Sequence, residues 1–402
     1  MKHDTQSLAK RKKLMAIFLG MFFCVANAQE SVGPVLEFAM GDTLSFSEEP
    51  ISLRSDKLGD WSVHGIATGL TFRQTNPTTV NEASYSGFSN AQMIVEKKDG
   101  LIQLFAQTGL YSIPIVGISY LRAQPTTETG FGYLPHAYVS VTPNTNWSLA
   151  LGKIPAMGGV EATFTYQNSN IQRGLLWVQT NSISRGMQLS YSDGPFSAAA
   201  TWNDGAYSDV YNWLGGLASI RANERSTYTA SWVGSVSGNA ANTVTTPLLQ
   251  NNSQIGNLIY QYAGERWAFT PYLQYTYVPE RTSVGINGSS GTFGVAMLAT
   301  YYVTPQIDGK PLSHKISIPI RFEYQSSHGD NGVTSIPAGL MYGPGSSAWS
   351  ATVTPTIQWK SLFARGEFSY VKAFNPSVES AFDANGLNNN QVRLMLEAGI
   401  LY

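Results

Sequence analysis

Residues 347 to 370 show the clearest alternation of apolar and polar side chains in the sequence. From Trp349 to Trp359 every second residue is apolar, and the intervening residues are Ser, Thr or Gln. A β-strand has a side-chain period of two, so this pattern predicts a strand with one apolar and one polar face. For a strand tilted by about 40°, the two tryptophan rings lie about 25 Å apart along a membrane normal. This separation is typical of the lipid-facing band of an outer-membrane barrel.

The chain then turns at Lys360 and Ser361 and returns as a second alternating segment. Leu362, Phe368 and Tyr370 share one side of that segment, whereas Arg365 and Glu367 share the other. The pattern predicts a transmembrane hairpin with lipid outside and a wet, charged lumen inside. Aromatic residues mark the expected membrane boundaries, and the predicted girdle comprises Trp349, Trp359, Tyr370 and Tyr402.

The same unit recurs from Trp61 to Tyr402. Alternating segments are connected first by a short polar turn and then by a longer loop, and this order repeats along the chain. One initial strand, seven short-turn pairs and one final strand predict an antiparallel up-and-down transmembrane β-barrel of about 16 strands, with 14 or 18 as alternatives. Short turns are expected on the periplasmic side and long loops outside. Pro271, Pro319 and Pro355 lie within strands and remove ladder hydrogen bonds, so they are the weakest points of the prediction.

The predicted strands are Trp61–Gln74, Gln92–Glu96, Leu101–Leu110, Leu134–Thr142, Trp147–Lys153, Arg185–Tyr191, Phe196–Asn203, Trp213–Ile220, Ser226–Val233, Gln254–Tyr262, Trp267–Val278, Thr292–Val303, Lys315–Gln325, the two strands of the Ser347–Tyr370 hairpin, and Gln391–Tyr402. The last strand alternates and ends on an aromatic residue. This ending resembles the C-terminal signature of barrels that the outer-membrane assembly machinery inserts; an ordinary edge strand is the alternative.

The N-terminus has the three parts of a cleavable secretory signal peptide over residues 1–28. Lys10–Lys13 form a basic region, Leu14–Val25 form an apolar run, and Ala26–Ala28 form a small-x-small cleavage site. The apolar run is shorter than the ~20 residues that span a bilayer, which argues against a retained anchor. Residues 29–60 lack clear alternation, and we interpret them as a periplasmic segment that is either a plug or a linker. The barrel is expected over residues 61–402.

Composition agrees with a barrel. The 402 residues are 43% hydrophobic but only 13% charged, whereas soluble proteins carry about 25% charged residues. Cys24 is the single cysteine and belongs to the leader, so the mature chain has no disulfide or thiol chemistry. The leader is basic, and its removal leaves a chain more acidic than the formal net charge of −1. This sign disfavours nucleic acid as a partner.

Charged side chains within strands should face the lumen, because Arg or Lys facing lipid at the bilayer midplane costs about 2–4 kcal/mol. The side-chain period places these residues on the lumen face: Arg73, Gln103, Gln107, Arg321, Glu323, Arg365, Glu367, Arg393 and Glu397. Opposed Arg and Glu side chains can form a pore constriction that filters solutes by charge. The alternative is that they compensate one another and hold the wall rigid.

Residues Ile154 to Ser184 form the longest loop between predicted strands. The loop is expected to fold into the lumen, with an extracellular flap as the alternative. Glu161, Gln172 and Arg173 are then candidate constriction residues. Lys153 has the lipid-facing period of its strand, so it can point inward only if the strand has already ended.

Several runs of the sequence resemble the β-barrel porin-2 (OmpL-like) family. The runs are L-G-K-I-P-A-M-G-G-V-E (151–161), N-I-Q-R-G-L-L-W (170–177), R-G-M-Q-L-S-Y (185–191), D-G-P-F-S (193–197), W-N-D-G-A-Y-S-D-V-Y-N-W (202–213), G-L-Y-S-I-P (109–114) and L-E-A-G-I-L-Y (396–402). The resemblance covers most of residues 65–402 and is strongest in the middle third. It implies an outer-membrane porin and indicates no particular substrate.

Motifs for enzymatic chemistry are weak or missing. The mature chain has His64, His136, His314 and His328, which are too scattered for a metal motif such as H-E-x-x-H. The sequence has no G-x-S-x-G elbow, P-loop or G-x-G-x-x-G. We therefore expect no catalytic residues, no metal and no cofactor.

The sequence predicts an outer-membrane porin of a Gram-negative bacterium. Small hydrophilic solutes would diffuse passively through a water-filled lumen that the Ile154–Ser184 loop narrows. A surface-exposed barrel with little conductance, such as an adhesin, is the alternative. The loops Ser112–Gly132 and Ser327–Ser346 would then contact a partner, although packing over the barrel mouth explains them equally well. Expected partners are outer-membrane lipid and lipopolysaccharide, the barrel-assembly machinery, small polar solutes and, by analogy with other 16-stranded barrels, two further copies in a homotrimer.

Overall fold

A computed structural model describes residues 44–47, 50–55, 59–77, 82–303, 315–333, 341–377 and 381–402. The predicted signal peptide 1–28 and most of the segment 29–60 lie outside the described residues. Among the described residues no helix is both long and apolar enough to cross a bilayer, a finding that leaves strands out of account.

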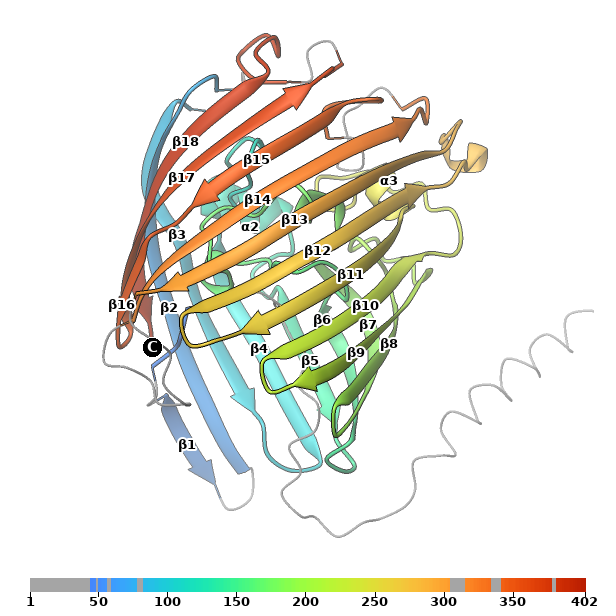
Figure 1. The fold of residues 1–402 in the computed structure, drawn as a ribbon. Helices are drawn as coiled ribbons and strands as arrows, with labels where there is room; N and C mark the ends of the chain where they lie inside the picture. The colour runs from blue at the N-terminus through green and yellow to red at the C-terminus, as the bar shows by residue number, and fades with distance from the viewer. Residues whose placement is uncertain are drawn as a thin grey trace, which may run out of the picture.

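The chain forms a closed antiparallel 16-strand β-barrel (Figure 1). Each strand pairs with its sequence neighbours, and the last strand pairs with β2, which closes the wall. The first half of the wall consists of β2 (Gly59–Gln74), β3 (Ser84–Lys97), β4 (Ile102–Tyr111), β5 (His136–Val141), β6 (Trp147–Pro155), β7 (Ile183–Asp193), β8 (Phe196–Asn203) and β9 (Trp213–Asn223). The second half consists of β10 (Ser226–Ser235), β11 (Gln254–Ala263), β12 (Trp267–Val278), β13 (Ser290–Tyr302), β14 (Lys315–Gly329), β15 (Ser347–Val353), β16 (Thr356–Trp359), β17 (Leu362–Phe374) and β18 (Asn390–Leu401).

The predicted hairpin of residues 347–370 is present, with one interruption at Pro355. β15 and β16 are two halves of one wall strand, and both pair with β14 and β17. Proline has no N–H for the ladder, so it divides the strand without moving it out of the wall. Trp349 and Trp359 lie on the outer face at opposite ends of this strand, whereas the side chains of Ser350 and Thr352 are buried inside.

The two ends of the barrel differ in their connections. Short turns join β7 to β8 and β9 to β10 at one end, near which the C-terminus lies, and longer loops gather at the other end (Figure 1). Helices α2 (Ala123–Thr129) and α3 (Leu248–Asn251) and the short 3₁₀ turn η3 (Thr282–Val284) belong to long loops, and the loop after β6 contains η1 (Thr165–Gln167) and η2 (Trp177–Gln179). We call these two ends the short-turn end and the long-loop end.

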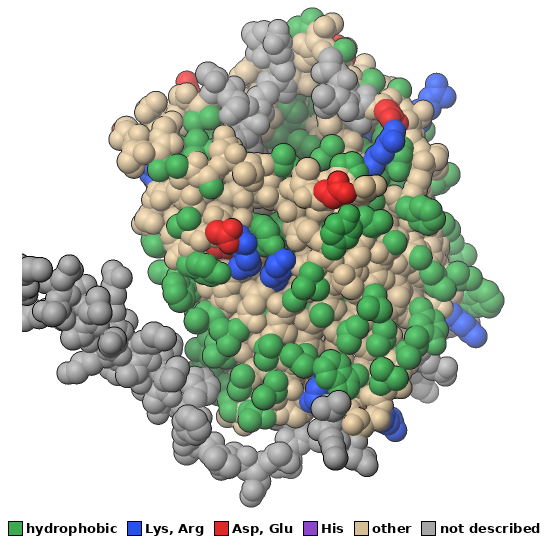
Figure 2. All heavy atoms as spheres, turned by 180° about the vertical axis from the view of Figure 1, so that it is seen from behind, with side chains coloured by type: hydrophobic (Ala, Val, Ile, Leu, Met, Phe, Trp, Pro, Cys, Tyr) green, Lys and Arg blue, Asp and Glu red, His purple; other side chains and the backbone are tan. Residues whose placement is uncertain are grey.

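The outer face is largely apolar, as expected for a wall in contact with lipid. Figure 2 shows one side of the barrel, on which hydrophobic side chains form a broad band and charged side chains are few. Exposed apolar residues on the outer face include Leu394, Leu396 and Ile400 of β18. Aromatic pairs lie toward the strand ends: Trp349 contacts Tyr370, and Trp147 contacts Tyr191, with ring centroids 5.1 and 4.7 Å apart.

The face predicted for β2 is wrong. Ile66, Leu70 and Phe72 point into the barrel and are buried, whereas Arg73, expected in the lumen, is exposed on the outside. Phe72 packs against Tyr120, which belongs to the loop after β4, with ring centroids 5.1 Å apart. The physical reason is that this part of the interior is filled with protein, which favours apolar neighbours where a water-filled lumen would favour polar ones.

Long loops fill the long-loop half of the interior with an apolar core. Leu175 and Leu176 from the loop after β6, Met341 and Tyr342 from the loop after β14, and Phe382 from the loop after β17 are all at most 4% exposed. They pack against inward side chains of the wall in one hydrophobic cluster. The barrel interior therefore has a packed core in this half.

The described part of the N-terminal segment contacts the barrel at the short-turn end. β1 (Ile51–Ser55) pairs with the first residues of β2. Phe46 packs against Tyr166 of the loop after β6, and Ser45 exchanges hydrogen bonds with the Gln358 side chain of β16. Residues 44–47 therefore contact both the barrel wall and the loop after β6.

Candidate functional site: the barrel interior and its inserted loop

Residues 156–182, between β6 and β7, fold into the barrel and cross to the opposite wall. We call this segment the inserted loop. Its backbone contacts charged side chains of β14 and β17, which lie 147 or more residues later in the sequence. Two of its side chains contact Glu397 and Arg393 of β18. A parallel bridge between Ile115 and Arg173 also ties the inserted loop to the segment after β4. The interior therefore contains a loop that is held from several sides.

Two glutamates of the wall bind successive backbone N–H groups of the inserted loop. Glu367 of β17 accepts hydrogen bonds from the backbone nitrogens of Ile171 and Gln172 at 2.6 and 3.0 Å. Glu323 of β14 accepts them from the backbone nitrogens of Leu175 and Leu176 at 2.9 and 3.2 Å. Both carboxylates satisfy donors that would otherwise be buried without a partner.

Three arginines of the wall bind backbone carbonyls. Arg321 of β14 donates to the carbonyl of Gln172 at 2.6 Å. Arg365 of β17 donates to the carbonyl oxygens of Thr165 and Asn168 at 2.9 and 2.8 Å, and it forms an ion pair with Glu397 of β18 at 2.6 Å. Arg393 of β18 donates to the carbonyl of Ile115 at 3.0 Å, and also to the carbonyl of Ile118 and the side chain of Gln172. Arginine suits this role because its guanidinium presents several donors in a fixed plane.

The inserted loop has its own charged residues, and they too are paired. Glu161 accepts hydrogen bonds from the Arg321 guanidinium at 2.6 Å and from the backbone nitrogen of Gly174 at 2.9 Å. Arg173 donates to the carbonyls of Asn170 and Ile171. Burial, partly opposed by the carboxylate of Glu161, lowers the pKa of Arg173 to about 10. Arg173 therefore remains charged at neutral pH.

All eight charged residues expected at a constriction face the interior, but their side chains are buried in contacts with other protein groups. Each has a buried side chain, and seven of the eight are at most 3% exposed. They are Glu161, Arg173, Arg321, Glu323, Arg365, Glu367, Arg393 and Glu397. Their contacts hold the inserted loop against the wall. A role in filtering solutes stays a prediction.

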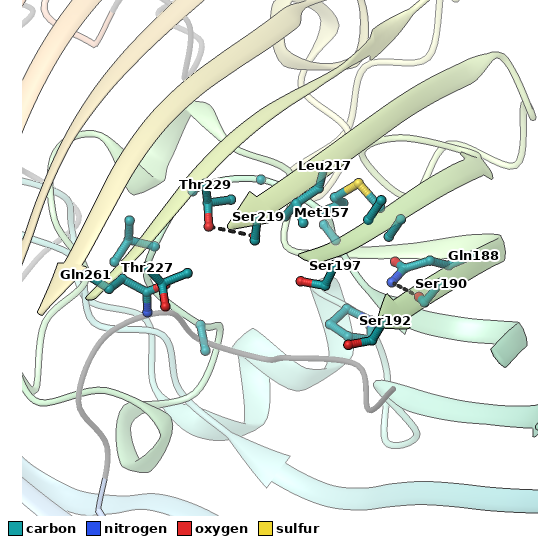
Figure 3. A pocket seen from close by; sticks show the side chains of 18 of the residues that line it. Met157, Gln188, Ser190, Ser192, Ser197, Leu217, Ser219, Thr227, Thr229 and Gln261 are labelled. Carbon is teal, nitrogen blue, oxygen red and sulfur yellow. Dashed lines mark hydrogen bonds between the residues drawn. The ribbon is translucent and has the colours of Figure 1, made fainter. Parts of the chain in front are cut away.

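An open space lies on the other side of the inserted loop. A cavity of about 470 Å³ is bounded by residues 155–163 and by the inner faces of β7 to β11, and it reaches the short turn at Gly194 and Pro195. Figure 3 shows Ser192, Ser197 and Thr227 pointing into it. The lining is dominated by hydroxyl and amide groups.

None of the functional residues predicted from the sequence lies on the inner faces of β7 to β11. A signal was present, because β7 to β10 have small Ser, Thr and Ala residues at inward positions where the last strands have Arg and Glu. Small inward side chains leave room that long charged ones fill. Lys153, by contrast, behaves as its period predicts: β6 continues to Pro155, and Lys153 lies on the outer face opposite Arg185.

In the part of the chain that the structure describes, no group of three or more His, Cys, Asp or Glu side chains could hold a metal ion. His136 is buried against Phe105 and Phe164, and His64 contacts Glu96 at 3.1 Å.

Comparisons with known proteins agree with this architecture. Residues 65–402 match the sequence model of the family described as "Putative beta-barrel porin-2, OmpL-like". No curated protein matches the chain.

Solved structures show a similar fold. OmpT, an outer membrane protein of Vibrio cholerae, aligns with a TM-score of 0.53 at 10% identity over 88% of this chain and 100% of its own. The outer membrane channel DcaP of Acinetobacter baumannii aligns with a TM-score of 0.51 at 11% identity over 87% of this chain and 99% of its own. At these identities the likeness concerns the fold alone.

Proposed function

Because the chain belongs to the β-barrel porin-2, OmpL-like family, we propose that it is a passive diffusion channel for small hydrophilic solutes. Family and fold point to the bacterial outer membrane and to a porin-type barrel. The observation that supports a diffusion channel is the polar cavity of about 470 Å³ inside the barrel, against the wall of β7 to β11. A space inside a membrane barrel that is lined by many hydroxyl groups and few charges suits water and small polar solutes.

The inserted loop narrows this channel. It occupies the interior beside β12 to β18, so the proposed route runs along β7 to β11. The eight buried charges secure the loop and thereby set the width of the route. In the proposed orientation the short-turn end is periplasmic, as in other bacterial barrels.

Several partners follow from this proposal. The apolar outer face, with its aromatic residues toward the strand ends, would contact outer-membrane lipid and lipopolysaccharide. The barrel-assembly machinery would recognise the C-terminal strand β18 and Tyr402, which follows it, after export with a cleaved signal peptide. A homotrimer remains part of the proposal. No enzymatic activity is proposed, because the family and the interior contacts both suit a channel.

A second candidate is a surface barrel with little conductance. The apolar cluster around Met341, Tyr342 and Phe382 favours it, because this cluster fills the long-loop half of the interior. In that case the loops at this end would bind a host or another partner.

Single-channel recording in planar bilayers separates the two candidates. Purified, folded protein should produce discrete current steps in neutral salt solution. Circular dichroism and resistance to heat in detergent should establish that the barrel is folded. A folded protein that gives no current above that of protein-free bilayers would rule out the channel and favour the surface barrel.

A further inference from the structure

The cavity has a continuous row of hydroxyl groups along its wall. Ser192 of β7 pairs with Ser197 of β8, Ser197 pairs with Ser219 of β9, and Ser219 pairs with Thr229 of β10. Residues directly opposite each other in an antiparallel sheet point to the same face about 4.5–5.5 Å apart. The row therefore presents four hydroxyl groups to the cavity across four neighbouring strands (Figure 3).

Part of this row has unused hydrogen-bonding capacity. Ser219 and Thr229 bond each other at 2.7 Å. Within the described protein the hydroxyl groups of Ser192, Ser197 and Thr227 have no hydrogen-bond partner, although all three line the cavity. A hydroxyl group is both donor and acceptor, so these side chains can bond a solute group of either kind.

Charge is nearly missing from the same wall. Two charged residues line the cavity, Glu161 and Arg221. Glu161 is already bound to Arg321 at 2.6 Å, and Arg221 is exposed at the end of β9 next to the short β9–β10 turn. Beyond Arg221, a charged solute would lose hydration along the four hydroxyl groups of the row without meeting a counter-charge, which is costly. A neutral solute with its own hydroxyl groups would exchange water for matching partners.

We propose that the cavity wall of β7 to β11 selects neutral polyhydroxylated solutes, that is, sugars or polyols, over charged solutes of the same size. This inference rests on the proposed channel function and adds the solute class to it. The cavity volume lies within the ~300–1,000 Å³ typical of small-molecule sites, which is sufficient for a small sugar.

Uptake into proteoliposomes tests the inference. Glucose, glucuronate and glucosamine have the same ring and differ in charge, so their initial uptake rates can be compared directly, with leakage into protein-free vesicles subtracted. Glucose should enter several-fold faster than either charged sugar. Equal rates for the three sugars, or faster uptake of a charged one, would overturn the inference.

Substitutions locate the selectivity. Replacing Ser192 and Ser197 together by alanine should lower glucose uptake, because the row loses two hydroxyl groups that are free to bond the solute. Ser197→Asp should reduce glucose uptake and favour cations. Thr276→Ala is the matched control, since Thr276 is an inward hydroxyl of β12 that does not line the cavity. Unchanged glucose uptake in the double variant would also refute the hydroxyl row.

The two proposals fail in different ways. A folded protein that gives no salt conductance and no uptake of any sugar refutes the channel itself. Salt conductance without preference for glucose leaves the channel in place and refutes the selectivity of the wall.

Discussion

Single side chains determine where the inserted loop lies. Glu323 and Glu367 point from different strands toward adjacent stretches of the loop, and each accepts two backbone N–H bonds. A hydrogen bond to a charged group contributes about 1.5–3 kcal/mol, so each glutamate fixes the loop more firmly than a neutral acceptor would. The loop sequence between them contributes mainly its backbone to these contacts.

Glu367→Gln should loosen the inserted loop near Ile171 and Gln172. The amide keeps the shape of the side chain but loses its charge and one acceptor, so the free energy of unfolding should fall by about 3 kcal/mol. Hydrogen exchange should also become faster at these two backbone amides.

Glu265→Gln is the control, because Glu265 is two-thirds exposed and pairs with Arg225 at 3.2 Å on the surface. That change should alter the free energy of unfolding by less than about 1 kcal/mol. Equal effects of the two substitutions in denaturant titrations would contradict the clamping role of Glu367.

Arg221 should influence ion selectivity more than the buried arginines do. It lines the cavity and is exposed, so Arg221→Glu should shift the reversal potential toward cation preference in a salt gradient. Arg225→Glu makes the same change in charge four residues away, in a side chain that does not line the cavity. If Arg225→Glu shifted the reversal potential as much as Arg221→Glu, the proposed route along β7 to β11 would be wrong.

Elements, unlike the packing inside the barrel, can be predicted from the sequence. The strands follow the two-residue period closely, including the hairpin that contains Pro355, because every wall residue faces either in or out. The residues on the last strands, from Arg321 to Glu397, were placed on the inward face by the same rule. Their partners could not be predicted, because the rule says nothing about which loop enters the interior or which backbone groups need partners there.

In β2 the two-residue period leads to the wrong choice of the lipid-facing side. Its inward residues Leu70 and Phe72 are apolar because they pack against Tyr120 and Ile171, which come from two different loops. Sequence alone gives these residues the same pattern as a lipid-facing row. The side-chain period identifies the two faces of a strand. It does not say which face contacts lipid where loops fill the interior with apolar side chains.

Removal of the inserted loop should widen the channel. Replacing residues 163–176 by a short Gly-Ser linker deletes the part that crosses the barrel, and single-channel conductance should rise at least about two-fold because more of the cross-section is open. Replacing η3 (Thr282–Val284) by Gly-Ser changes a long loop that is mostly exposed, and conductance should not change. A loop-deleted barrel that is folded but conducts no better would show that other loops limit the current.

At the scale of the whole molecule, position in the membrane determines the cost of a charge. Leu396 is 62% exposed in the middle of β18, and Leu387 is 71% exposed in a loop at the long-loop end. Leu396→Arg should lower the free energy of unfolding in lipid vesicles by about 2–4 kcal/mol, whereas Leu387→Arg should have little effect. Similar costs for both substitutions in urea titrations would contradict a lipid-facing β18.

The sequence positions of the inserted loop and of its clamps have a consequence for assembly. The loop emerges in the first half of the chain, yet Thr165 bonds Glu397 of β18, 232 residues later. The backbone N–H and C=O groups of the loop that are buried in the finished barrel therefore have no protein partners until the C-terminal strands have been exported. A chain that stops before β17 would have no closing strand and would lack four wall residues that hold the loop: Arg365, Glu367, Arg393 and Glu397. Only a full-length chain can therefore form these interior contacts. We expect barrel closure and loop docking to occur together, late in assembly.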